Sequence, residues 1–170
     1  MMFRKLHSTW QPQRPTQGQL LQQYTEEGDD RGIRYWSIRQ DHALWDLILP
    51  HRRHLWSMSL MTITTSIPPH TDSGARTVVN CYGATADAVT HFHSQRQQTL
   101  TQRQVQNQTT GHLYDPRELT IQSEFTARAG EHWILAVDHI HSVTTHSTAE
   151  RWAICLSTDQ PIQRAEEDLA

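Results

Sequence analysis

The stretch IPPHTD, residues 67–72, places an imidazole and a carboxylate two positions apart, directly after two prolines that predict a turn. In an extended backbone, side chains two positions apart point to the same side. His70 and Asp72 can therefore bind one ion together. Because the chain has 12 His and 18 Asp and Glu residues, one such tripeptide is expected by chance. Its meaning depends on the segments around it.

Runs of β-forming residues surround this stretch and predict strands. They cover residues 33–38, 58–65, 76–82, 88–93, 119–127, 133–137, 141–145 and 152–158. Gly, Pro, Ser and Asp separate these runs, and no helical period lies between those after residue 55. Such a pattern indicates a mainly β sandwich or barrel.

The N-terminal part of the chain has a different character. Residues 1–18 show little periodicity and are predicted to be a loosely held lead-in. Leu20, Leu21 and Tyr24 have helical spacing, and Asp41 is a candidate cap for a second short helix that Pro50 ends. We therefore expect a single domain of 170 residues, with a helical and strand prefix (1–54), a β core (55–158) and an acidic tail (159–170).

Composition narrows the possible partners and location. The net charge is −3 and Lys5 is the only lysine, so no basic tract indicates nucleic-acid binding. No apolar run reaches the ~20 residues of a membrane span, and the first residues lack the apolar stretch of a signal peptide. A cytoplasmic protein is the expectation, with Cys81 and Cys155 as buried free thiols.

A second group of candidate residues lies about 70 positions after the first. His139 and His141 alternate along a predicted strand, and Arg151 follows His141 by ten positions. Two histidines and one carboxylate form the facial triad of non-haem Fe(II) oxygenases. A guanidinium close to such a triad can bind a carboxylate through two parallel hydrogen bonds.

With these residues, the segment 55–158 resembles the 2-oxoglutarate/Fe(II)-dependent dioxygenases, closest to the aspartyl/asparaginyl β-hydroxylase and cis-3-proline hydroxylase group. The resemblance implies a double-stranded β-helix, or jelly roll, with short N-terminal helices outside one sheet. It also implies that His70, Asp72 and His141 bind Fe(II). His141 is preferred to His139 because the family has an Arg ten residues after its distal His, and His139 stays open as the alternative.

The resemblance also implies a co-substrate site and a reaction. Arg151 would bind the distal carboxylate of 2-oxoglutarate, and Asn80 or Arg76 would face its other carboxylate, where the family has a basic or imidazole side chain. The reaction would consume O2 and 2-oxoglutarate, release succinate and CO2, and hydroxylate an unactivated C–H bond. Asp72 favours hydroxylation over halogenation, because related halogenases lack a carboxylate at this position. The expected substrate is an amino-acid-like small molecule or a peptide side chain, and the oligomeric state is left open.

Two other readings remain open. His91 and His93 also share one face of a predicted strand and, with His139 or His141, would form the site of a cupin-type metal enzyme. The third reading is a β-sandwich binding module without catalytic activity. The Gln-rich segment 94–110 is either a solvated loop or a lid over the site.

Overall fold

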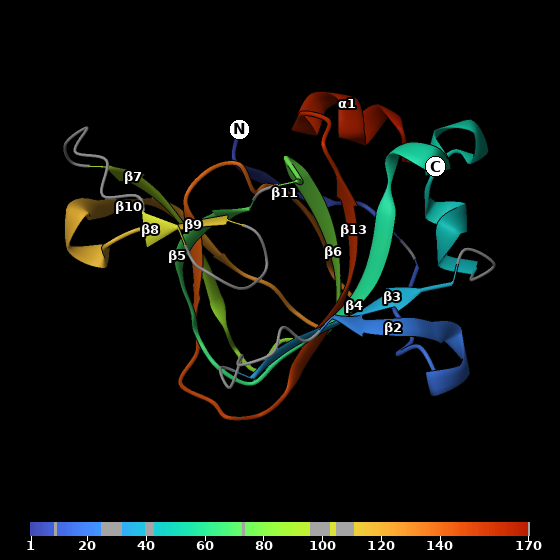
Figure 1. The fold of residues 1–170 in the computed structure, drawn as a ribbon, viewed down its shortest axis with the longest axis horizontal. Coiled ribbons are helices and arrows are strands. Elements are labelled where there is room, and N and C mark those ends of the chain that lie inside the picture. Colours follow the sequence, from blue (N-terminus) through green and yellow to red (C-terminus); the bar gives the residue numbers. More distant parts are fainter. Residues whose placement is uncertain are drawn as a thin grey trace.

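The computed structural model describes residues 1–8, 10–24, 32–39, 43–72, 74–95, 103–104 and 111–169. Within these residues, the strands form two antiparallel sheets that face each other (Figure 1). The seven-stranded sheet has the order β1 (Phe3–Leu6), β11 (His132–Ala136), β6 (Thr77–Ala84), β13 (Arg151–Thr158), β4 (Ser57–Ile63), β3 (Ile33–Ile38) and β2 (Leu20–Tyr24). The six-stranded sheet has the order β10 (Leu119–Thr126), β7 (Val89–Gln95), β12 (His141–Thr144), β5 (Ile67–Asp72), β9 (Gly111–Leu113) and β8 (Arg103–Gln104).

The path of the chain through these sheets is that of a jelly roll. From β4 to β7 the chain passes to the opposite sheet at each step, and it does so again from β10 to β13. Each sheet thereby receives four of these eight strands, with β11-β6-β13-β4 in one sheet and β10-β7-β12-β5 in the other. The predicted mainly β jelly roll is confirmed.

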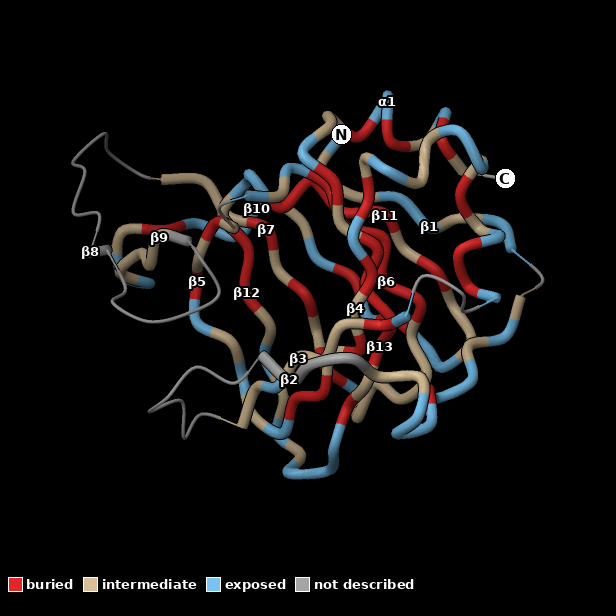
Figure 2. The backbone as a smooth tube through the Cα atoms, turned by 45° about the vertical axis from the view of Figure 1, so that its right-hand side comes forward, coloured by how far each residue is buried: buried red, intermediate tan, exposed pale blue. Residues whose placement is uncertain are grey.

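The seven-stranded sheet is buried on both faces at its centre (Figure 2). Val78 and Ala153 pack into the cluster between the sheets, whereas Val79 and Ile154 pack into a second cluster on the outer face. A strand buried on both sides needs apolar residues at successive positions rather than at every second one. This explains why β6 and β13 are continuous apolar runs in the sequence.

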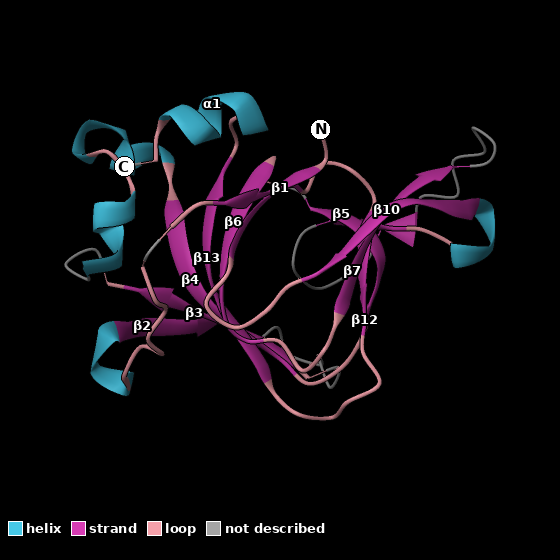
Figure 3. Cartoon of the chain, turned by 180° about the vertical axis from the view of Figure 1, so that it is seen from behind, coloured by secondary structure: helices cyan, strands magenta, loops and turns pink. Residues whose placement is uncertain are grey.

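The outer face of the seven-stranded sheet is covered by short helical segments (Figure 3). These segments are η2 (Ala43–Leu47), η3 (Pro50–Leu55) and α1 (Ile162–Glu167). The buried side chains that these segments contribute to the outer cluster are Leu44, Trp45, Ile162 and Ala165. Two further 3-10 turns, η1 (Gln17–Gln19) and η4 (Pro116–Glu118), contribute no buried residue. Within the described part of the chain, no helix is long and apolar enough to cross a membrane.

Three expectations for the termini need correction. Residues 1–18 are not only a loose lead-in, because β1 pairs with β11 at the edge of the large sheet. Residues 20–24 form a strand paired with β3, although their apolar spacing predicted a helix. The acidic tail includes α1, whose Ile162 and Ala165 are buried.

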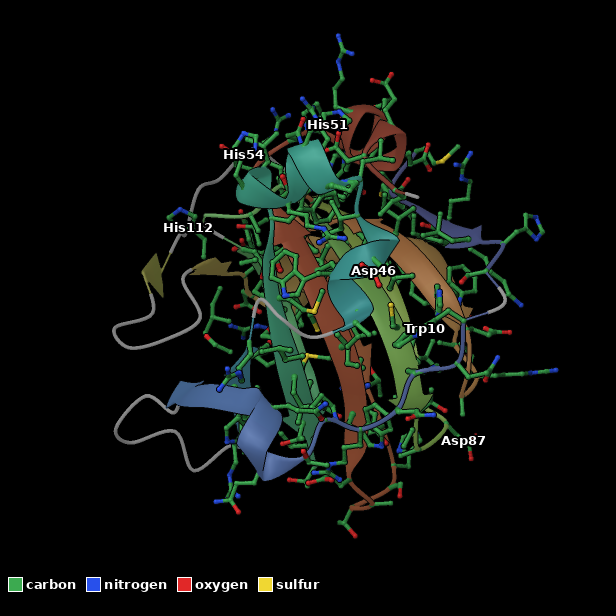
Figure 4. All side chains as sticks on the ribbon, turned by 90° about the vertical axis from the view of Figure 1, so that its right-hand side faces the viewer. Trp10, Asp46, His51, His54, Asp87 and His112 are labelled. Carbon is green, nitrogen blue, oxygen red and sulfur yellow. The ribbon has the colours of Figure 1, made fainter. Side chains whose placement is uncertain are left out.

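The second predicted helix is a 3-10 turn over Ala43–Leu47, and Pro50 begins a further 3-10 turn rather than a loop. In that turn His51 and His54 point outward at the periphery of the molecule (Figure 4). Arg52 and Arg53 pair with Asp168 and Asp46, respectively. Except for β8, residues 96–110 of the Gln-rich segment lie outside the described residues, so the two readings of that segment are not separated.

Candidate metal centre

Strand β5 carries His70 and Asp72 on the face that looks into the space between the sheets. The two prolines before them do not form a turn. They lie inside the strand, at an irregularity where Pro68 and Pro69 of β5 face Ser142 alone on β12. Proline has no N–H to give to a ladder, so a bulge is a position where a strand tolerates it. After the bulge, β5 resumes pairing with His70 directly opposite His141.

Three potential ligand atoms converge on the inner face of the six-stranded sheet. One ligand atom each of His70, Asp72 and His141 lies within 4.8 Å of the other two. Asp72 Oδ1 is 3.2 Å from His70 Nε2 and 4.0 Å from His141 Nε2. Among the described residues this is the only such group of three His, Cys, Asp or Glu side chains.

Backbone carbonyls hold both imidazoles in the orientation that a metal requires. His70 Nδ1 is 2.9 Å from the carbonyl oxygen of Pro68, and His141 Nδ1 is 2.9 Å from that of His139. A carbonyl oxygen only accepts, so each Nδ1 carries the proton and donates it. Each neutral ring then has its lone pair on Nε2, the atom that faces Asp72. In a metal-binding histidine, the ring nitrogen that does not bind the metal usually donates such a hydrogen bond, and this bond fixes the tautomer.

The two rings differ in their affinity for protons. Burial acts to lower the pKa of His70, but the hydrogen bond to Asp72 and the charge of that carboxylate outweigh it, so the pKa of His70 is raised. Burial, together with repulsion from His70, lowers the pKa of His141 to about 4. His141 is therefore neutral at neutral pH, and a metal ion at this group would compete with protons for His70.

The group lies on the wall of a cavity of about 120 Å³ between the sheets, here called the inner cavity. Its opposite wall is formed by the seven-stranded sheet, and Arg151 at the start of β13 is part of that wall. Arg151 is 8% exposed, and its Nε has no hydrogen-bond partner among the described residues. Burial lowers the pKa of this guanidinium, and Arg151 is the only arginine among the described residues that line the cavity.

Arg151 also lacks the partners that a purely structural role would give it. Glu150 pairs with Arg14, at 2.5 Å, and Asp138 pairs with Arg76 and His139. No carboxylate of the described residues forms an ion pair with Arg151. A buried cation without a counter-charge is costly, so this side chain fits an anionic ligand.

Two polar side chains of β6 face the same cavity. Asn80 is 8% exposed and donates from Nδ2 to Tyr82 Oη at 3.2 Å. Its Oδ1 has no partner in the described part of the chain. Burial raises the pKa of Tyr82 to about 12, so the phenol stays protonated. The sequence analysis did not identify Tyr82 as a site residue. Its spacing could have done so, because positions 80 and 82 share a face of the strand and Asn80 was already a candidate.

Arg76 and His139 lie outside the inner cavity. Arg76 is exposed just before β6, with its Nε 3.2 Å from Asp138 Oδ2. His139 is also exposed, and its Nδ1 is 3.0 Å from Asp138 Oδ1. The backbone carbonyl of His139 orients His141, so its contribution to the group is through the main chain.

The alternative histidine set is divided between two faces of the six-stranded sheet. Thr90 and Phe92 of β7 face inward. His91 and His93 occupy the alternate positions of the strand and therefore face outward. His91 lies against Glu124, and His93 Nε2 is 2.8 Å from Ser142 Oγ. His141 is on the inner face, so it does not converge with these two imidazoles.

Comparisons with known proteins give a likeness in fold only. No family model and no curated protein matches the sequence. Solved structures that are similar include vicilins from Corylus avellana (11% identity, TM-score 0.45, covering 79% of this chain and 30% of that one) and Capsicum annuum (11%, 0.47, 91% and 40%). Another is an oxalate decarboxylase (8%, 0.40, 77% and 27%). This chain thus spans less than half the length of those proteins.

Proposed function

We propose that the protein is an Fe(II)- and 2-oxoglutarate-dependent hydroxylase. The observation that carries this proposal is the position of two complementary groups in the inner cavity. The three potential metal ligands come from the six-stranded sheet. The guanidinium of Arg151, which forms no ion pair with the described carboxylates, comes from the seven-stranded sheet. A ligand that chelates a metal at one end and carries a carboxylate at the other would satisfy both.

The donor set suits Fe(II), because two imidazoles and one carboxylate are the protein ligands of the non-haem iron facial triad. Two imidazoles and one carboxylate, all from one wall, leave coordination positions free on the side of the cavity. There is no thiolate in the group, because Cys155 lies in the cavity lining with its pKa raised by burial and stays protonated. Iron bound there would supply the redox chemistry for O2 activation and C–H hydroxylation.

The residues of the seven-stranded sheet would position the co-substrate. Arg151 would donate two parallel hydrogen bonds to the distal carboxylate of 2-oxoglutarate. Asn80 would face the other carboxylate. A half-turn flip of its amide would let Oδ1 accept from Tyr82 Oη and Nδ2 donate to the carboxylate.

The proposed substrate is an amino-acid-like small molecule or a peptide side chain. The net charge of −3 and the single lysine do not suit phosphate-backbone binding. Apolar side chains from both sheets line the rest of the cavity, among them Met61, Ile67 and Val143. A substrate that reaches this wall would present an aliphatic C–H bond to the iron.

The test is a succinate-release assay with Fe(II), 2-oxoglutarate and O2. Pools of free amino acids, short Pro-, Asp- or Asn-containing peptides, nucleosides and single-stranded DNA would be compared. The proposal expects coupled turnover with an amino acid or a peptide pool, and loss of turnover in Asp72→Ala and Arg151→Ala. Succinate formation that is equal in wild type and Asp72→Ala would refute it, and coupled turnover on nucleic acids alone would overturn the substrate class.

A further inference from the structure

A second cavity, of about 270 Å³, lies on the outer face of the seven-stranded sheet and is here called the outer cavity. The sheet separates it from the inner cavity. This is clearest in β6, where Val78 lines the inner cavity and the next residue, Val79, lines the outer one. The outer cavity is lined by Arg4, Leu6, His7, Ser8, Leu47, Val79, Cys81, His132, Leu156, Glu166 and Leu169.

The floor of the outer cavity is apolar apart from one imidazole. Val79, Cys81 and Leu156 are buried side chains of the floor, and Leu6 and Leu169 line the walls. His132 stands directly opposite Cys81 in the β11–β6 pair and opposite Leu6 in the β1–β11 pair. Burial raises the pKa of the Cys81 thiol to about 12, so the thiol is neutral.

The imidazole of His132 is 3% exposed, and its Nε2 has no hydrogen-bond partner in the described part of the chain. Burial lowers the pKa of His132 despite a hydrogen bond with the backbone of Trp10. A backbone carbonyl that raises the pKa of an imidazole accepts its proton, and Nε2 is the atom without a partner. With Nδ1 assigned as the donor to the backbone of Trp10, the neutral ring has its lone pair on the buried Nε2, which can then accept a hydrogen bond.

The entrance of the cavity carries compensated charges. Arg4 Nη2 is 2.5 Å from Glu166 Oε1, so the cation and the carboxylate at this rim neutralise each other. Buried polar atoms are normally satisfied by protein, water or ligand. The floor thus offers a ligand one acceptor, no charge and a large apolar surface.

We propose that the outer cavity binds a small uncharged molecule with an apolar body and one hydrogen-bond donor, of the kind that a phenol represents. The apolar body contacts Leu6, Val79 and Leu156, and the donor group bonds to His132 Nε2. The volume exceeds the ~150 Å³ of an apolar cavity that accommodates benzene, so a substituted ring fits. This site is independent of the proposed iron site, because the whole sheet lies between them.

The experiment is a titration of the unmodified protein with p-cresol, observed through the methyl groups of Leu and Val by carbon-13 NMR. We expect concentration-dependent shifts at Leu6, Val79 and Leu156, and none at Val78 or Val143, which line the inner cavity. p-Xylene, which has a methyl in place of the hydroxyl, should bind about tenfold more weakly, because it leaves the buried acceptor unpaired.

The variant His132→Leu tests the acceptor directly. It should bind p-xylene at least as well as the wild type and lose the preference for p-cresol. Its methyl spectrum and its metal binding at the inner cavity show whether it is folded, and the comparison of the two probes in the wild type needs no variant. Shifts at Val78 in place of Val79, equal affinities for both probes, or a preference that persists in His132→Leu would each overturn the proposal.

Discussion

His70 and His141 stand directly opposite each other on β5 and β12, with ring centroids 4.2 Å apart, and each donates from Nδ1 to the carbonyl of the residue two positions before it. In both strands, the same type of side chain-to-backbone hydrogen bond thus orients the imidazole. Because both acceptors are main-chain carbonyls, these hydrogen bonds do not depend on the identity of other side chains nearby. Both Nε2 atoms are held ready for a metal before any metal binds.

The first prediction concerns metal affinity. Substitution of His70, Asp72 or His141 by Ala should weaken Fe(II) binding by about 100-fold or more, since even partners of metal ligands contribute 10–100-fold. His139→Ala is the matched control, because the ring of His139 lies outside the group while its carbonyl remains. Anaerobic metal titration measures the affinity. Retained binding in His141→Ala combined with loss in His139→Ala would show that the third ligand was misassigned.

The second prediction is that Arg151 lowers the stability of the ligand-free protein and strengthens the binding of 2-oxoglutarate. Without a ligand, its buried charge has no counter-charge among the described residues. Arg151→Met keeps most of the volume and removes the charge, so it should raise the free energy of unfolding by about 1–3 kcal/mol in ligand-free protein. Urea denaturation measures this difference.

The same variant should bind 2-oxoglutarate at least tenfold more weakly with Fe(II) affinity unchanged, and Arg151→Lys should recover little because lysine lacks the planar fork. A lower stability of Arg151→Met would mean that the guanidinium is satisfied within the protein. That result would remove the argument for an anionic ligand.

The third prediction is a pH dependence that arises from Asp168, the residue that follows α1. Asp168, 1% exposed, accepts hydrogen bonds from Arg52, Trp56 and Gln160. Burial alone acts to raise the pKa of this carboxyl, but these bonds outweigh it and the pKa is lowered. The unfolded chain therefore takes up a proton first as the pH falls below about 4. The stabilisation is present above that pH and is lost as the pH falls through the folded-state pKa.

Asp168→Asn tests this prediction, because it keeps the shape and removes the charge. At pH 7 it should lower the free energy of unfolding by about 2–4 kcal/mol, and its stability should fall less steeply than that of the wild type below pH 4. Parallel acid denaturation curves for the two proteins would contradict the assignment.

The fourth prediction concerns the packing of β13 against β6. A Cβ at Gly83 would lie 2.0 Å from two ring atoms of Trp152. Gly83→Ala should therefore destabilise the fold by about 1–3 kcal/mol through overpacking. Gly18→Ala is the control, since nothing lies within 4 Å of its added Cβ and it should change stability by less than about 0.5 kcal/mol. Thermal unfolding of the two variants should differ clearly, and similar midpoints would argue against the contact.

Local sequence patterns predicted seven of the eight jelly-roll strands, because those strands have their own β-forming residues and turn residues between them. They missed β5, where Pro68 and Pro69 predicted a turn. The predicted strand at 33–38 coincides with β3. The patterns failed where a partner decides the structure. Residues 20–24 have helical spacing but pair with β3, and β1 is a four-residue edge strand whose pairing with β11 no local pattern reveals.

The candidate site divides in the same way. His70 and Asp72 were visible together because they are close in sequence and share a face of a strand. The choice of His141 over His139 came from the resemblance, and the structure places His141 beside the other two because of the β5–β12 register. The bulge at Pro68 and Pro69, and the carbonyl hydrogen bonds that orient the two imidazoles, are three-dimensional features that the sequence does not reveal. The ion pair of Arg76 with Asp138, which holds Arg76 outside the cavity, was equally invisible in the sequence.

The measurement that tests the central claim most directly is an anaerobic calorimetric titration of the wild-type protein with 2-oxoglutarate, with and without one equivalent of Fe(II). The account predicts one binding site for 2-oxoglutarate that depends on Fe(II), because the group of His70, Asp72 and His141 and the guanidinium of Arg151 each hold one end of the ligand. Binding of equal strength without Fe(II), or no binding in its presence, would contradict it.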